Sequence, residues 1–131
     1  MSDRPARSLT FYIAASSADV PLASACMRDM EALGLSNAMD WTRCIGAPEY
    51  QWPQLATGDI DAARDADVFV LLTGGRRVGA SGLLVELGAR LSAGRAVHLV
   101  GGRWHFFMHH PLVVHHRDWR VFVESSEGRA S

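Results

Sequence analysis

The feature that most constrains the fold is a continuous apolar run at Val68–Thr73, bounded by Gly74 and Gly75. A strand with one face in water alternates apolar and polar residues, whereas a continuous run is typical of a strand buried on both faces. Strands of that kind occur in parallel sheets whose two faces are covered by helices. The run therefore predicts an α/β protein with a parallel sheet.

The segments on either side of this run alternate between strand and helix patterns. Short apolar runs predict further strands at Leu9–Ala15 and Ala96–Val100, and we expect another strand at Ser36–Trp41 after the first helix. Apolar residues at helical spacing predict helices at Val20–Leu33, Pro53–Ala66 and Gly82–Ala93. This order predicts an open, doubly wound parallel sheet of four to five strands with flanking helices, as in flavodoxin-like and Rossmann-like proteins.

The length of 131 residues fits one domain. We place that domain at residues 9–124, with a flexible N-terminal tail at 1–8 and a flexible C-terminal tail at 125–131. The last part of the domain is expected to hold a short helix, a strand and a helix, at Trp104–Met108, Leu112–His115 and Asp118–Glu124.

All 13 basic residues are arginine, so the chain has no lysine. This excludes Schiff-base catalysis, a P-loop lysine and the lysine of a receiver domain. The net charge of -1 gives no general attraction for a nucleic acid polymer or an acidic membrane, so the expected partner is a small molecule.

No apolar run is long enough to cross a bilayer, and Met1–Ser8 lacks the apolar core of a signal peptide. We therefore expect no membrane partner and a cytoplasmic protein. The two cysteines, Cys26 and Cys44, are too few for a disulfide framework and are interpreted as reduced thiols.

In a doubly wound sheet, ligands bind beyond the carboxyl ends of the strands. This rule selects three loops, at Ala14–Asp19, Thr73–Gly82 and Gly101–Trp104. Glu86 follows the glycine-rich second loop, close to the positive end of the next helix, which would keep its carboxylate ionised. The alternative is structural, because acidic residues also stabilise the first turns of helices.

Asp59 interrupts the apolar stripe of its helix, which otherwise consists of Leu55, Ala56, Ile60 and Ala63. An ionisable group on a packed face requires a partner or a function, so Asp59 belongs either to a buried polar network or to a site. If Glu86 and Asp59 share a crevice, the pair suits glycosidic-bond cleavage, in which one carboxylate attacks the anomeric carbon and the other handles the proton.

Three segments resemble the nucleoside 2-deoxyribosyltransferase family and the related nucleoside 5′-monophosphate N-glycosidases. Phe11–Ala15 resembles the family's opening strand, and Asp59 precedes Ala66–Val70 as the family's aspartate precedes its "aDvvv" strand. Gly82–Val97 resembles the motif "GT..vElG.Ala.gkpv", with Glu86 in register.

The resemblance implies cleavage of the N-glycosidic bond of a nucleoside or nucleotide through a glycosyl-enzyme, by hydrolysis or base exchange and without a cofactor. In it Glu86 is the nucleophile, Asp59 assists departure of the base, and Tyr12 orients Glu86 through a hydrogen bond. The substrate-binding residues that we select are Ala14, Ser16, Ser17, Trp41, Trp52, Gly79, Ser81 and Gly82. For Trp41 and Trp52, a place in the core or an interface is the alternative to contact with the base.

Two positions depart from the family pattern. Ala80 stands where transferases carry an acidic residue, and Leu83 stands where threonine is frequent. These departures keep open a second interpretation, a catalytically silent nucleotide-binding module on the same fold. A phosphate could be held by hydroxyls and arginines of the two loops, namely Ser16, Ser17, Arg76, Arg77 and Ser81.

A receiver-like signalling domain is the third interpretation, and the sequence disfavours it. The third predicted strand ends in Leu72-Thr73 instead of an aspartate, and no lysine is available. Five of the six histidines lie in His105–His116, where Pro111 and the absence of a nearby cysteine argue against a metal site. Because a domain of this size gives a shallow crevice, we also expect a homodimer or higher homo-oligomer.

Overall fold

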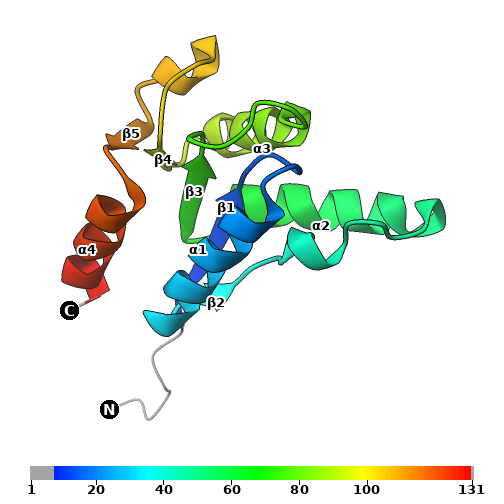
Figure 1. Cartoon of the computed structure of the whole chain (residues 1–131), viewed down its shortest axis with the longest axis horizontal. Helices are drawn as coiled ribbons and strands as arrows, with labels where there is room; N and C mark the ends of the chain where they lie inside the picture. The colour runs from blue at the N-terminus through cyan, green and yellow to red at the C-terminus, as the bar shows by residue number, and fades with distance from the viewer. Residues whose placement is uncertain (1–7, 131) are drawn as a thin grey trace.

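Five parallel strands form one sheet in the order β2-β1-β3-β4-β5 (Figure 1). The structure, a computed structural model, describes residues 8–130. The strands are β1 (Thr10–Ala14), β2 (Ser36–Asn37), β3 (Val68–Leu72), β4 (Val97–Val100) and β5 (Val113–His116). In the register at the centre of the sheet, Tyr12 of β1 lies opposite Phe69 of β3. The parallel α/β architecture predicted from the sequence is confirmed.

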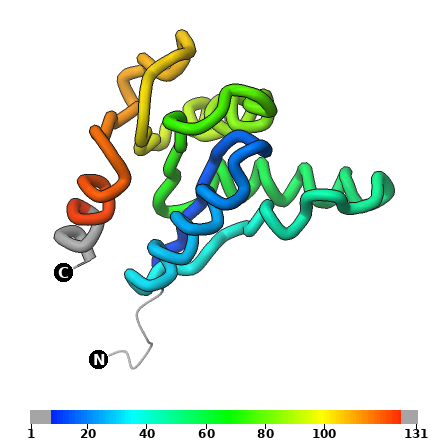
Figure 2. Tube along the Cα trace, viewed as in Figure 1, coloured from blue at the N-terminus to red at the C-terminus, as the bar shows by residue number. Residues whose placement is uncertain are grey.

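Four α-helices cover the two faces of this sheet: α1 (Val20–Ala32), α2 (Trp52–Asp65), α3 (Ser81–Ser92) and α4 (Trp119–Ala130). Helices α2 and α3 pack against each other over β1, and α3 also packs on β3 and β4. On the other side, the Trp119 indole N–H of α4 donates to the Asp29 carboxylate of α1 at 2.8 Å. The chain trace in Figure 2 follows this winding from strand to helix.

The central strands are buried on both faces, as the apolar run predicts. Phe11 and Ile13 of β1, and Phe69 and Leu71 of β3, are all 0% exposed. Burial of such side chains is the main favourable contribution to folding, at roughly 25 cal/mol for each Å² of apolar surface. The core thus holds β1 and β3 firmly side by side.

The direction of winding reverses between β1 and β3. The chain passes from β1 through α1 to β2 on one side, and then returns through α2 to β3 on the other side of β1. The loops that follow β1 and β3 therefore leave the sheet side by side while their helices cover opposite faces. This is the switch point at which doubly wound proteins bind ligands.

The second strand is shorter than the sequence predicts, because β2 ends at Asn37 instead of reaching Trp41. The Asp40 carboxylate accepts a hydrogen bond from the Thr42 N–H at 3.1 Å and caps a short 3₁₀ helix at Trp41–Arg43. Side-chain capping of this kind competes with strand pairing. It turns the chain out of the sheet and toward the switch point.

Helix α4 is the last element that the structure describes. Helix α4 continues to Ala130, through most of the segment 125–131 where a flexible tail was expected. The predicted N-terminal tail, residues 1–8, lies outside the described residues except for Ser8. Among the residues described, no helix is long and apolar enough to span a membrane.

A buried guanidinium joins α3 to the end of α2. Arg90 of α3 is 2% exposed, and its Nη1 donates to the carbonyls of Ala63 (3.4 Å) and Ala66 at the carboxyl end of α2. Its Nε donates to the Ala96 carbonyl at 3.0 Å, and its cation lies 5.8 Å from the centre of the Phe69 ring. A cation is favourable at this negative end of a helix.

We expect Arg90→Met to lower the free energy of unfolding by about 3 kcal/mol or more, because several buried carbonyls lose a charged donor. The matched control is Arg95→Met. Arg95 also donates to a carbonyl at the carboxyl end of α2, that of Asp65 at 2.9 Å, but its side chain is more exposed than that of Arg90. Urea unfolding followed by circular dichroism measures both variants. Equal losses for the two variants would contradict the special role of the buried guanidinium.

Candidate active site

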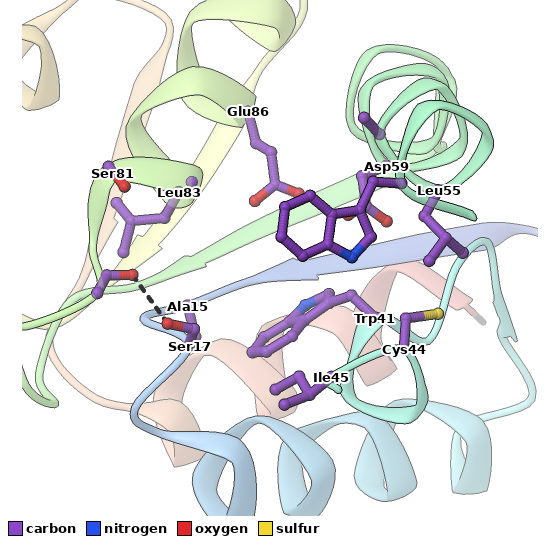
Figure 3. A pocket seen from close by; sticks show the side chains of 14 residues that line it. Ala15, Ser17, Trp41, Cys44, Ile45, Leu55, Asp59, Ser81, Leu83 and Glu86 are labelled. Carbon is purple, nitrogen blue, oxygen red and sulfur yellow. Dashed lines mark hydrogen bonds between the residues drawn. The ribbon is translucent and has the colours of Figure 1, made fainter. Parts of the chain in front are cut away.

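A pocket of about 490 Å³ opens at the carboxyl ends of β1 and β3, beside α2 and α3 (Figure 3). The loops after β1 and β3 contribute Ala15, Ser17 and Gly79, and α3 contributes Ser81, Gly82, Leu83 and Glu86. The segment between β2 and α2 contributes Trp41, Cys44 and Ile45, and α2 contributes Trp52, Leu55, Ala56 and Asp59. The volume lies in the range of small-molecule sites.

The carboxyl group of Glu86 points into this pocket and is only 9% exposed (Figure 3). Its Oε2 atom accepts a hydrogen bond from the hydroxyl of Tyr12, which lies on β1 and is fully buried. Burial and the neighbouring Glu86 carboxylate both raise the pKa of Tyr12, so this hydroxyl stays protonated and acts as the donor. The contact joins α3 to the centre of the sheet.

The pKa of Glu86 is raised to about 8. Burial is the main cause, the Tyr12 hydrogen bond partly offsets it, and the neighbouring charge of Asp59 adds a smaller upward shift. This corrects the expectation that the helix end keeps the carboxylate ionised. Helix α3 begins at Ser81, so Glu86 lies beyond its first turn. The dipole effect weakens beyond that turn, and burial therefore dominates.

Asp59 lies on α2 and faces the same pocket (Figure 3). Its Oδ1 atom is inaccessible to solvent and has no hydrogen-bond partner among the described residues. Burial raises the pKa of this carboxyl as well. Leu55 and Ala56 of the predicted apolar stripe line the pocket, whereas Ala63 is fully buried. Asp59 interrupts the stripe because this part of the stripe faces a cavity instead of the core.

The loops after β1 and β3 touch at Gly79. Its carbonyl accepts hydrogen bonds from the Ser17 backbone N–H at 3.2 Å and from the Ser17 hydroxyl at 3.4 Å. Gly79 has φ +70°, and a Cβ atom there would collide with the Ser17 hydroxyl. The positive φ therefore favours glycine at this position, and a side chain here would also force the Ser17 hydroxyl to move.

Six of the eight selected substrate-binding residues line the pocket: Ser17, Trp41, Trp52, Gly79, Ser81 and Gly82. The other two, Ala14 and Ser16, are buried and do not line it. The Ser16 hydroxyl instead donates to the Val78 carbonyl and so holds the neighbouring loop. Ser16 lies just after β1, where its buried side chain contacts the loop after β3 instead of facing the pocket.

The two arginines considered for a phosphate do not line the pocket. The Arg76 backbone N–H donates to the Asp19 carboxylate at 2.6 Å, and the Arg77 guanidinium lies 5.2 Å from the centre of the Trp104 ring. Both residues are exposed in the loop after β3. Of the five candidate phosphate ligands, only Ser17 and Ser81 face the pocket.

Sequence reasoning missed several residues of the pocket wall. Cys44 and Ile45 come from the long segment before α2, and Leu83 comes from the first turn of α3. The length of that segment was the available signal, since long loops in compact domains are often functional. Within residues 8–130, no group of three or more His, Cys, Asp or Glu side chains could hold a metal ion.

We expect Glu86→Gln to stabilise the protein increasingly as the pH rises. Because burial raises the pKa of Glu86 to about 8, the folded state retains a proton that the unfolded state releases near pH 4.5, and stability falls between these values. Glutamine has no such proton, so the variant should gain on the order of 3 kcal/mol over the wild type at pH 9 and little at pH 5.

The control for this comparison is Glu49→Gln, because Glu49 is exposed on the surface. Urea unfolding between pH 5 and pH 9 measures both variants against the wild type. A difference between Glu86→Gln and the wild type that does not change with pH would refute the raised pKa.

Comparison with known proteins finds similarity at the level of structure. No family model matches the chain, and no curated protein matches its sequence. Its structure is similar to that of the CMP N-glycosidase BcmB from Clostridium botulinum, with a TM-score of 0.59. The match covers 92% of this chain and 98% of that chain at 14% sequence identity. The chain therefore has the fold of a nucleotide N-glycosidase, which is the fold that the resemblance of its motifs implied.

Proposed function

We propose that the protein cleaves the N-glycosidic bond of a nucleoside or nucleoside 5′-monophosphate, with Glu86 as nucleophile. The observation that carries this proposal is that the carboxyl groups of Glu86 and Asp59, on different helices, face one pocket while Tyr12 holds Glu86. Two carboxyl groups beside one cavity are what glycoside cleavage needs. The fold shared with a CMP N-glycosidase supports the same reaction class.

In the first step, a carboxylate oxygen of Glu86 forms a bond to C1′ of the sugar as the bond from C1′ to the base nitrogen breaks. The base leaves with that electron pair and accepts a proton from Asp59. The raised pKa of Asp59 suits this role, because it increases the protonated fraction that can donate. The product is an ester between Glu86 and the sugar.

In the second step, Asp59 accepts a proton from the incoming nucleophile, which forms a bond to C1′ and releases Glu86 as a carboxylate. Water as nucleophile gives hydrolysis, and a second base gives exchange. The two displacements together retain the configuration at C1′. Tyr12 keeps its hydrogen bond to Oε2 of Glu86, so the other oxygen, Oε1, is the one free to attack.

We expect the wild-type protein to release free base from at least one member of a panel of ribo- and deoxyribonucleosides and their 5′-monophosphates. Chromatography separates base, sugar and substrate, and it distinguishes hydrolysis from exchange when a second base is added. Glu86→Ala should abolish release, because it removes the attacking oxygen.

Base release that survives Glu86→Ala would rule out Glu86 as nucleophile. Substrate binding without any release by the wild type would favour the silent nucleotide-binding module. Thermal stabilisation by the same panel detects binding independently of turnover.

The rate should depend on the protonation of Glu86. Since the first step needs Glu86 ionised and Asp59 protonated, kcat/KM should depend on pH as a bell, and one of its two limbs should have its midpoint near the Glu86 pKa of about 8. Tyr12→Phe removes the hydrogen bond that lowers this pKa, so the midpoint should move to higher pH. At pH 7 we expect kcat/KM to fall by about tenfold or more.

Tyr50→Phe is the matched control, because Tyr50 is 81% exposed and lies outside the pocket wall. Initial rates between pH 5 and pH 10 provide the profiles. A Tyr12→Phe profile with the midpoint of the wild type would show that this hydroxyl does not act on the nucleophile.

A further inference from the structure

The pocket has two ends of different chemistry on either side of the carboxyl pair. One end is formed by Ser17, Gly79, Ser81 and Gly82, which offer hydroxyls and backbone groups. The other end, which we name the leaving-group bay, is formed by Trp41, Cys44, Ile45, Trp52, Leu55 and Ala56. In Figure 3, Ser17 and Ser81 lie on one side of Glu86, and Cys44 and Leu55 lie on the other.

The proposed reaction assigns these ends to the two halves of a nucleoside. The sugar, with its hydroxyls, suits the end with Ser17 and Ser81. The base has flat apolar faces and suits the leaving-group bay, next to Asp59, which must reach it with a proton. This assignment rests on the proposed function.

The leaving-group bay has few side-chain groups that could recognise the edge of a base. Its indole N–H groups are both engaged by backbone carbonyls. Trp41 donates to Ile13 at 2.6 Å, and Trp52 donates to Ala47 at 2.9 Å. The thiol of Cys44 is a weak hydrogen-bonding group, and it already donates to the Asp40 carbonyl at 3.9 Å. Ile45, Leu55 and Ala56 have none.

These hydrogen bonds also orient the two indole rings. Trp41 is 9% exposed and is held against β1 by its bond to Ile13. Trp52 is 56% exposed at the start of α2, and its bond to Ala47 ties it to the preceding loop. Indole faces can stack on any base, because every base has a π-face.

We infer that the leaving-group bay selects the base by shape and stacking on tryptophan rather than by hydrogen bonds to the base edge, so that the protein accepts bases of different hydrogen-bonding pattern. A site built to hydrogen-bond its substrate rejects the wrong pattern by about 10⁴-fold, whereas an apolar site discriminates by roughly 10- to 200-fold. The two kinds of recognition therefore differ by a measurable margin.

The test uses pairs of nucleotides with the same shape and opposite edge patterns, CMP with UMP and AMP with IMP, together with their deoxy forms and free nucleosides. Glu86→Gln prevents turnover, so binding can be measured without the effect of leaving-group chemistry. Isothermal titration calorimetry at pH 7 gives the dissociation constants. We expect the two members of each pair to differ by less than about 200-fold.

Stacking is tested at Trp52 in the same Glu86→Gln background. Trp52→Leu should weaken binding of every base in the panel by about 5- to 100-fold, because it removes an aromatic face. Trp52→Phe keeps an aromatic face without the N–H, so binding should stay within about threefold. Tyr50→Leu is the control for a neighbouring aromatic side chain that is exposed and outside the bay.

The outcomes test the inference about the leaving-group bay separately from the proposed function. A difference beyond 200-fold within a pair, or equal losses for Trp52→Leu and Trp52→Phe, overturns the inference. The proposed function survives that result if the wild type releases the base that binds. Binding of both members of a pair without release by the wild type supports the bay and overturns the reaction. Absence of binding by every nucleotide and nucleoside overturns both.

Discussion

The geometry of the pocket depends on the buried guanidinium of Arg90. Arg90 follows Glu86 by one helical turn on α3, and Ala63, whose carbonyl accepts its hydrogen bond, follows Asp59 by one turn on α2. The two carboxyl groups therefore stand one turn away from a contact that joins their helices. Because a helix is stiff over one turn, the register fixed at this contact also fixes how far apart the carboxyl groups lie.

The same pocket carries a cost in stability. Glu86 is held in a buried position where its charge is unfavourable, and the hydroxyl of Tyr12 offsets only part of that effect. Asp59 adds a second, half-buried carboxyl, whose inaccessible Oδ1 atom has no hydrogen-bond partner among the described residues. Stability alone would favour amide or apolar side chains at both positions. Such a concentration of poorly solvated titratable groups in one cavity is typical of active sites, where function compensates for lost stability.

The sequence was sufficient for the features that depend on local pattern. The run at Val68–Thr73 predicted the buried central strand, and the interruption of an apolar stripe identified Asp59. Features that depend on contacts between distant segments were missed. The ionisation of Glu86 depends on burial in the assembled fold, Ser16 is taken up by the loop after β3, and Cys44 reaches the pocket only because the chain leaves the sheet after β2.

The two ends of the pocket come from parts of the fold with different freedom to change. Tyr12 and the loops after β1 and β3 belong to the switch point, where the packing of the central strands restricts substitution. Most of the leaving-group bay comes from the segment between β2 and α2 and the start of α2, outside the sheet. Under the proposed function, a hydrogen-bonding side chain in place of Ile45 or Leu55 would introduce edge recognition without disturbing Glu86. Base selectivity would then change independently of the proposed bond-breaking groups.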